Sequence, residues 1–140
     1  MGIYQQQSQT RIKACILKYF HALGALLFLT MAVIQLNDPD PLYWFVVYIM
    51  VMIVSLAKFF NRPIDMFAKV TTGMVLAGLL ISVTGVIEYF TAEDFGSITG
   101  RMTVEKPYIE SAREFGGLFI ASIYLIFYEL TKNSHNKGQD

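Results

Sequence analysis

The sequence predicts an all-α integral membrane protein, a bundle of four transmembrane helices joined by short loops. Of its 140 residues, 54% are hydrophobic and 16% are charged, whereas a typical soluble domain carries about 25% charged residues. The charges fall in short stretches around four apolar runs, and each run could cross ~30 Å of hydrocarbon as a helix of ~20 residues. Lipid offers backbone groups no partners, so helices are expected in these runs.

The predicted spans cover residues 14–36, 42–60, 66–90 and 108–131. They lie in one transmembrane domain, residues 13–132, between polar tails at 1–12 and 133–140. We expect residues 5–9 and 133–140 to be disordered. The first apolar run is longer than a signal-peptide core and no small-x-small cleavage pattern follows it, so we expect it to remain a span.

Prolines mark the breaks between the spans. Pro39 and Pro41 end the first helix, because proline disfavours helical backbone in the residue before it. Asp40 is then placed to cap the second helix, with Pro41 at its first position. Pro63 separates the second and third spans, and Pro107 is placed to open the fourth.

Composition excludes several classes of function. Lys and Arg together number 11, as do Asp and Glu, so the chain lacks the basic excess of a nucleic-acid-binding protein. Cys15 is the only cysteine, which excludes disulfide frameworks, Cys-rich zinc sites and thiol relays. The expected partner is the lipid bilayer.

Small residues on helical faces indicate close helix packing. They are Gly24, Ala25 and Ala32 with Phe28 in the first span, Gly73, Ala77, Gly78, Ser82 and Gly85 in the third, and Gly116, Gly117 and Ala121 in the fourth. Packing within the bundle is the preferred interpretation, and contact with a second copy or another membrane protein is the alternative.

His21 is a polar residue about two turns inside the first span. Ionisable residues within the membrane are candidates for function. The alternative is structural, with a neutral histidine bonded to a neighbouring helix. His135 lies in the polar tail, so a pair of haem-ligating histidines is not expected.

The strongest functional signal comes from two charged segments, residues 35–41 after the first span and 110–117 at the start of the fourth. The topology brings both to the same side of the membrane. Glu110 and Glu114 are one helical turn apart and face the same way. Arg113 can pair with Glu110, and the helix N-terminus favours both carboxylates.

If the two segments meet, they form one polar site. Its carboxylates, which suit a hard divalent cation or a cationic ligand, are Asp38, Asp40, Glu110 and Glu114. The other candidate members are Gln35, Asn37 and Arg113. A purely structural interpretation stays open, with Asp40 as a helix cap and the glutamates as partners of the helix dipole.

The same segments resemble the transmembrane protein 220 family of small polytopic membrane proteins. The matching residues are Gln35-x-Asn37-Asp38-Pro39-Asp40, Val46-Val47-Tyr48 and Glu110-x-x-Arg113-Glu114-x-x-Gly117-Leu118. The resemblance implies a membrane bundle and supports the polar site, but implies no activity.

Two functions remain. One is a binding protein whose outer carboxylates hold a divalent cation or cationic ligand. The other is a structural or accessory subunit that docks a larger membrane complex, with the charged rim purely structural. An enzyme using Glu110 or Glu114 as general acid or base is less favoured, because no nucleophile–base pair accompanies them.

The charge distribution predicts the orientation. The side with both termini and the 60–66 connection has three acidic residues, Asp65, Glu129 and Asp140, and eight basic ones: Arg11, Lys13, Lys18, Lys58, Arg62, Lys69, Lys132 and Lys137. The other side has three basic residues, Arg101, Lys106 and Arg113. Cytoplasmic loops are rich in Lys and Arg, so we expect a plasma (bacterial inner) membrane protein with both termini in the cytoplasm.

Cysteine labelling tests this orientation in a Cys15→Ala background. A membrane-impermeant maleimide should label Ser97→Cys in intact cells and should label Ser134→Cys only after the cells are opened. The reverse pattern would show that the termini lie outside.

Overall fold

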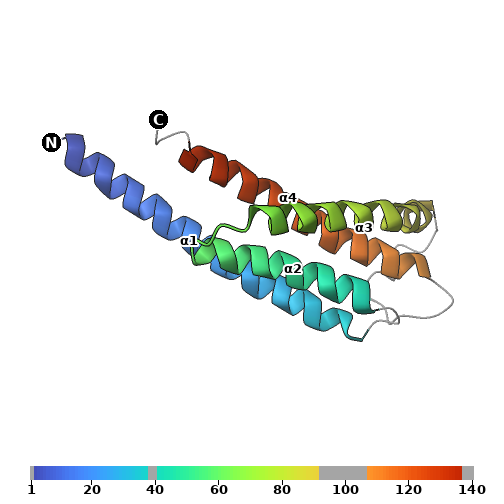
Figure 1. Ribbon diagram of the computed structural model, residues 1–140. Coiled ribbons are helices and arrows are strands. Elements are labelled where there is room, and N and C mark those ends of the chain that lie inside the picture. Colours follow the sequence, from blue (N-terminus) through green and yellow to red (C-terminus); the bar gives the residue numbers. More distant parts are fainter. Residues whose placement is uncertain (1, 38–40, 92–106, 137–140) are drawn as a thin grey trace. The chain divides into compact units, whose positions relative to one another are not determined.

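The structure, a computed structural model, describes residues 2–37, 41–91 and 107–136. These residues form four α-helices and no strand (Figure 1): α1 Gly2–Gln35, α2 Pro41–Phe59, α3 Asp65–Thr91 and α4 Pro107–Asn136. Each helix is long and apolar enough to cross a membrane, over Gln5–Gln35, Pro41–Phe59, Asp65–Thr91 and Tyr108–Thr131. The predicted fold class is confirmed.

Three helices begin with residues suited to a helix start. Pro41 and Pro107 open α2 and α4 as predicted, because the first helical position needs no backbone N–H and proline fixes φ near its helical value. Asp65 opens α3, where its negative charge is favourable beside the helix N-terminus. The predicted cap, Asp40, lies outside the described residues.

The first and last helices, α1 and α4, continue into residues 5–9 and 133–136, which were predicted to be disordered. For these residues the prediction was wrong. α1 includes residues 5–9, four glutamines and one serine, and α4 continues to Asn136. Glutamine is a good helix former, and extending an existing helix avoids the unfavourable nucleation step. The side chains of residues 5–9 are exposed, so this part of α1 is helical without packing.

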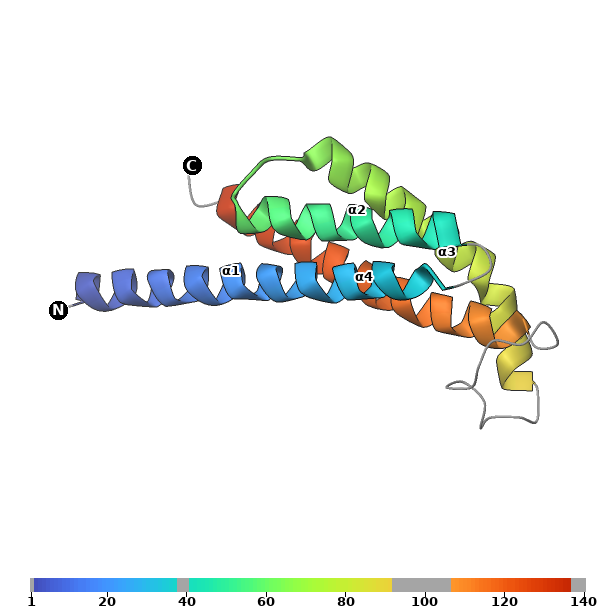
Figure 2. The same ribbon diagram turned by 90° about the horizontal axis from the view of Figure 1, so that it is seen from below.

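The chain divides into two compact units, Met1–Ala68 and Lys69–Asp140. In the first, α1 and α2 lie side by side and antiparallel (Figures 1 and 2). Ser55 Oγ donates a 2.7 Å hydrogen bond to the backbone carbonyl of His21, and the Lys18 ammonium lies 4.7 Å from the centre of the Phe59 ring. The contacts move back along α2 as they advance along α1, as an antiparallel pair requires.

α2 ends in a Schellman turn. The N–H of Asn61 donates to the carbonyl of Lys58 at 3.0 Å, and the N–H of Arg62 donates to the carbonyl of Ala57 at 2.7 Å. Asn61 has φ 53°, the left-handed conformation that this turn needs and that asparagine tolerates better than most residues. The turn satisfies two carbonyls at the helix end and fixes Asn61 one turn beyond Lys58.

In the second unit, α3 and α4 are also antiparallel. Gly85, near the end of α3, lies against Ser111, near the start of α4. At the opposite end, Thr72 and Glu129 help to line one groove of about 250 Å³ between the two helices. A Cβ built on Gly85 would overlap Ser111 Cβ and lie 2.9 Å from its Oγ, so this contact requires glycine.

Large apolar side chains cover much of the surface. Leu23, Leu80, Ile81, Ile126 and Leu130 are each more than 60% exposed. So large an apolar surface is unusual for a soluble monomer and is what lipid contact requires.

The prediction of packed small residues is confirmed for α1, where Gly24, Ala25, Phe28 and Ala32 are buried. In α3 it was partly wrong, because Gly73 and Ala77 are exposed although Gly78, Ser82 and Gly85 are buried. Gly116 of α4 is exposed too, with nothing within 4 Å of a built Cβ. Gly116 and Gly73 therefore make none of the close helix contacts predicted for them.

Gly85 and Gly73 provide a matched test of the α3–α4 contact. Gly85→Ala should destabilise the protein by roughly 1–3 kcal/mol, because the added methyl overpacks against Ser111. Gly73→Ala should leave thermal melting in detergent unchanged or slightly raised, because a Cβ at Gly73 meets nothing within 4 Å and alanine favours helix.

The double variant Gly85→Ala/Ser111→Gly should recover much of the loss, because the second change removes the Cβ that the new methyl meets. Equal melting temperatures for Gly85→Ala and Gly73→Ala would show that the contact does not limit stability.

Candidate functional site

The first two turns of α4 place three charged side chains together. Glu114 is buried, with 7% of its surface exposed, and Glu110 and Arg113 are partly buried. Nη2 of Arg113 is buried and has no hydrogen-bond partner among the described residues. Glu110 and Glu114 share a face of α4, as the sequence predicts. The charged segment of α4, residues 110–114, is thus withdrawn from solvent at the end of a span.

The other predicted site residues are only partly described. Gln35 is the last residue of α1 and is 8% exposed, whereas Asn37 is exposed and its N–H donates to the Ile34 carbonyl at 3.3 Å. Asp38 and Asp40 lie outside the described residues. The predicted contact between residues 35–41 and the charged segment of α4 therefore stays a prediction.

No metal centre is formed by the residues that the structure describes. Within them, no group of three or more His, Cys, Asp or Glu side chains could hold a metal ion. Of the four carboxylates predicted to bind a cation, only Glu110 and Glu114 lie within the described residues. The predicted set as a whole is untested.

His21 is buried, with 1% of its surface exposed. Its backbone carbonyl accepts the Ser55 hydroxyl from α2, and its ring packs edge-to-face against the adjacent Phe20, with ring centres 5.8 Å apart. His21 therefore belongs to the α1–α2 contact, and its backbone carbonyl accepts the hydrogen bond from Ser55 of α2.

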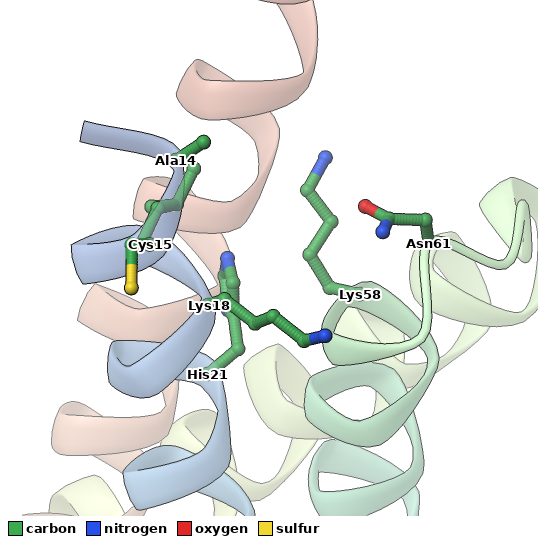
Figure 3. Close-up of a pocket in the computed structure, with 7 residues that line it drawn as sticks. Ala14, Cys15, Lys18, His21, Lys58 and Asn61 are labelled. Atoms are coloured by element: carbon green, nitrogen blue, oxygen red, sulfur yellow. The ribbon is translucent and has the colours of Figure 1, made fainter. Parts of the chain in front are cut away.

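A second polar site, which the sequence reasoning missed, lies between α1 and α2. It is a pocket of about 360 Å³ (Figure 3) with Cys15, Lys18 and His21 from α1, Lys58 from α2 and Asn61 from the following turn in its lining. Figure 3 shows the Lys18 side chain running from α1 toward α2 and the Asn61 amide turned toward Lys58. We call this the basic pocket.

Local structure fixes each polar group of the basic pocket. The Phe59 ring holds the Lys18 ammonium next to α2 through a cation–π contact. Lys58 lies in the last turn of α2, where a cation favours the helix C-terminus, and the Schellman turn positions Asn61. His21 closes the buried end, while Cys15, Lys18 and Asn61 are exposed at the rim. No lining residue is acidic.

A signal for the basic pocket was present in the sequence. In the sequence, Lys18 and Lys58 both belong to the basic excess on the side of the termini. An antiparallel pair of consecutive spans brings the start of the first span next to the end of the second. The two lysines must therefore lie at the same edge of the membrane. The depth of the pocket depends on the side-chain rotamers and on the position of Asn61. The sequence pattern predicts neither of these.

A family of known proteins matches most of the chain. The sequence model of a family described as transmembrane family 220, helix, matches residues 27–130. This range contains both charged segments singled out in the sequence and excludes the α1 side of the basic pocket. No curated protein and no solved structure matches the chain.

Proposed function

The chain belongs to transmembrane family 220, and we propose that it binds a divalent cation or a cationic ligand at the outer edge of the plasma (bacterial inner) membrane, with both termini in the cytoplasm. The observation that carries the proposal is the burial of Glu114, which is 7% exposed and one turn beyond a second carboxylate. The excess of Lys and Arg beside the termini supports the orientation.

Charge balance favours a cationic ligand at this segment. Glu110 and Glu114 carry two negative charges, and Arg113 carries one positive charge, so the charged segment of α4 has one negative charge in excess. A carboxylate withdrawn from water needs hydrogen bonds and a counter-charge. Asp38 and Asp40 would raise the excess to three if they adjoin the segment, and that would suit a divalent cation with several oxygen ligands.

The alternative is an accessory subunit. In that case Glu110 and Glu114 favour the start of α4 through the helix dipole, an effect of about 1 kcal/mol or less each, and the charged rim contacts a partner protein. This function requires no ligand, so a response to ions separates the two.

Thermal melting of the purified protein tests cation binding. If a divalent cation binds only the native state, a hundredfold excess over Kd should raise stability by ~2.7 kcal/mol. Calcium, magnesium, manganese and zinc are each added at millimolar concentration. Glu114→Gln should abolish the rise in melting temperature, because it removes a buried negative charge and keeps the side-chain shape.

Glu88→Gln is the matched control. Glu88 is exposed near the end of α3 and on the same predicted side of the membrane, so its loss should leave the ion response intact. Melting that is unchanged by all four ions in the wild-type protein would favour the accessory subunit. An equal loss of response in both variants would point to diffuse surface charge.

The predicted meeting of the two segments is tested by cross-linking in a Cys15→Ala background. Cysteines at Asn37 and Glu110 should form a disulfide on mild oxidation, because a disulfide needs Cα atoms within about 7 Å. Cysteines at Asn37 and Thr131 should not, because some 20 helical residues, about 30 Å, separate Glu110 from Thr131 along α4. If the Asn37/Glu110 cysteine pair also fails to form a disulfide, the shared site is rejected.

A further inference from the structure

We propose that the basic pocket binds the phosphate of an anionic lipid headgroup at the membrane edge that it shares with the chain termini. The site is distinct from the charged segment of α4 and does not depend on cation binding there. The chemistry it recognises is a phosphate group with net negative charge, held by two ammonium groups and an amide.

The charge of the pocket is the first support. Lys18 and Lys58 come from different helices and both line one cavity of about 360 Å³ whose lining has no carboxylate. Two positive charges on the lining of one cavity, with no carboxylate beside them, favour an anion there. Lysine is a common phosphate ligand that acts as a point charge with three donors. Basic pockets between transmembrane helices on the cytoplasmic side are typical sites for anionic headgroups.

The donors of the pocket are positioned before any ligand arrives. The cation–π contact with Phe59 holds Lys18 across the gap, and the Schellman turn holds the Asn61 amide at the rim. A site whose side chains are already placed loses less conformational entropy when a ligand binds. In Figure 3 the His21 ring is directed into the same space, at the buried end of the cavity.

The surroundings favour a lipid as the source of the phosphate. Tyr19, Phe20 and Phe60 are exposed and adjoin lining residues in the sequence, and interfacial aromatic residues of this kind lie at the level of the headgroups. Ile16 and Leu23, on the same helix as Lys18, are 64% and 66% exposed. A lipid could place its phosphate between the lysines and its acyl chains along this apolar surface, whereas a free phosphate ion gains nothing from it.

Native mass spectrometry of the full chain, titrated with phosphatidylglycerol or phosphatidylcholine, measures the binding. Phosphatidylglycerol should bind more tightly, because choline neutralises the phosphate of phosphatidylcholine. Lys18→Gln and Lys58→Gln should each weaken phosphatidylglycerol binding about fivefold, and the pair roughly 25-fold, as expected for ~1 kcal/mol per lysine near an anionic surface. Lys18→Arg/Lys58→Arg keeps both charges and should retain most of the binding.

Lys13→Gln/Lys69→Gln is the matched control. Both lysines are exposed, neither lines the pocket, and their loss removes the same net charge on the same predicted side. This double variant should bind phosphatidylglycerol nearly as well as the wild type. An equal loss of binding in the two glutamine pairs, or no loss in either, would overturn the proposal. Circular dichroism confirms that each variant remains helical.

Cys15 supplies a second readout in the unmodified protein. Its thiol is exposed at the rim and is the only one in the chain, so the rate of alkylation by iodoacetamide reports occupancy of the pocket. Phosphatidylglycerol in nanodiscs should slow the reaction several-fold relative to phosphatidylcholine in the wild type and in Lys13→Gln/Lys69→Gln. It should not slow it in Lys18→Gln/Lys58→Gln. Unprotected Cys15 in the wild type would count against the site.

Inorganic phosphate added to the protein in phosphatidylcholine nanodiscs distinguishes the source. If the headgroup is the ligand, millimolar phosphate should leave Cys15 alkylation unchanged. Protection by phosphate alone, lost in the Lys18/Lys58 pair, would overturn the lipid assignment and identify the pocket as a site for a soluble anion.

Discussion

The constraint on which this protein depends is that hydrocarbon cannot hydrogen-bond the backbone. Every residue within the bilayer must satisfy its N–H and C=O inside a helix, so irregular backbone and most charged side chains are confined to the ends of the spans. Both candidate sites are consequences of that confinement. The charged segment of α4 occupies the start of one helix, and the basic pocket forms where residues 14–21 of α1 meet the end of α2. The Schellman turn at Asn61 satisfies carbonyls at a helix end and positions a side chain of the pocket at the same time.

Within lipid, water no longer drives apolar surfaces together, so helix pairs depend on close packing and polar contacts. The two units meet this requirement differently. α3 and α4 come into close contact at Gly85, which has no side chain to hold Ser111 away. α1 and α2 are joined by a hydrogen bond from Ser55 to the backbone of His21 and by the ring of Phe59 beneath an ammonium group. Glycine is therefore essential at one crossing, while the other depends on polar side chains that also shape a cavity.

The sequence predicted the fold class because length and apolarity alone decide whether a helix can cross lipid. Proline chemistry located the starts of α2 and α4 for the same local reason. The ends of α1 and α4 were harder, because polar residues such as those at 5–9 can either fray or extend a helix that is already nucleated. The orientation of small residues also needed the structure, since Gly73 and Gly85 look alike in a pattern and only Gly85 faces another helix. The burial of Glu114 follows from packing around it, which no spacing rule supplies.

The length of α1 has a consequence for the water phase. At 1.5 Å per residue, its 34 residues extend about 51 Å, against ~30 Å of hydrocarbon. About 20 Å of helix therefore projects from one face of the bilayer as a continuation of the span. A helix of this length would be too short to be stable alone in water. The part of α1 inside the membrane is already helical and serves as the nucleus for this projecting part. A thicker bilayer would shorten the projection, and a thinner one would lengthen it or tilt the helix. The distance from the bilayer to the first residues of α1 would thus report local membrane thickness.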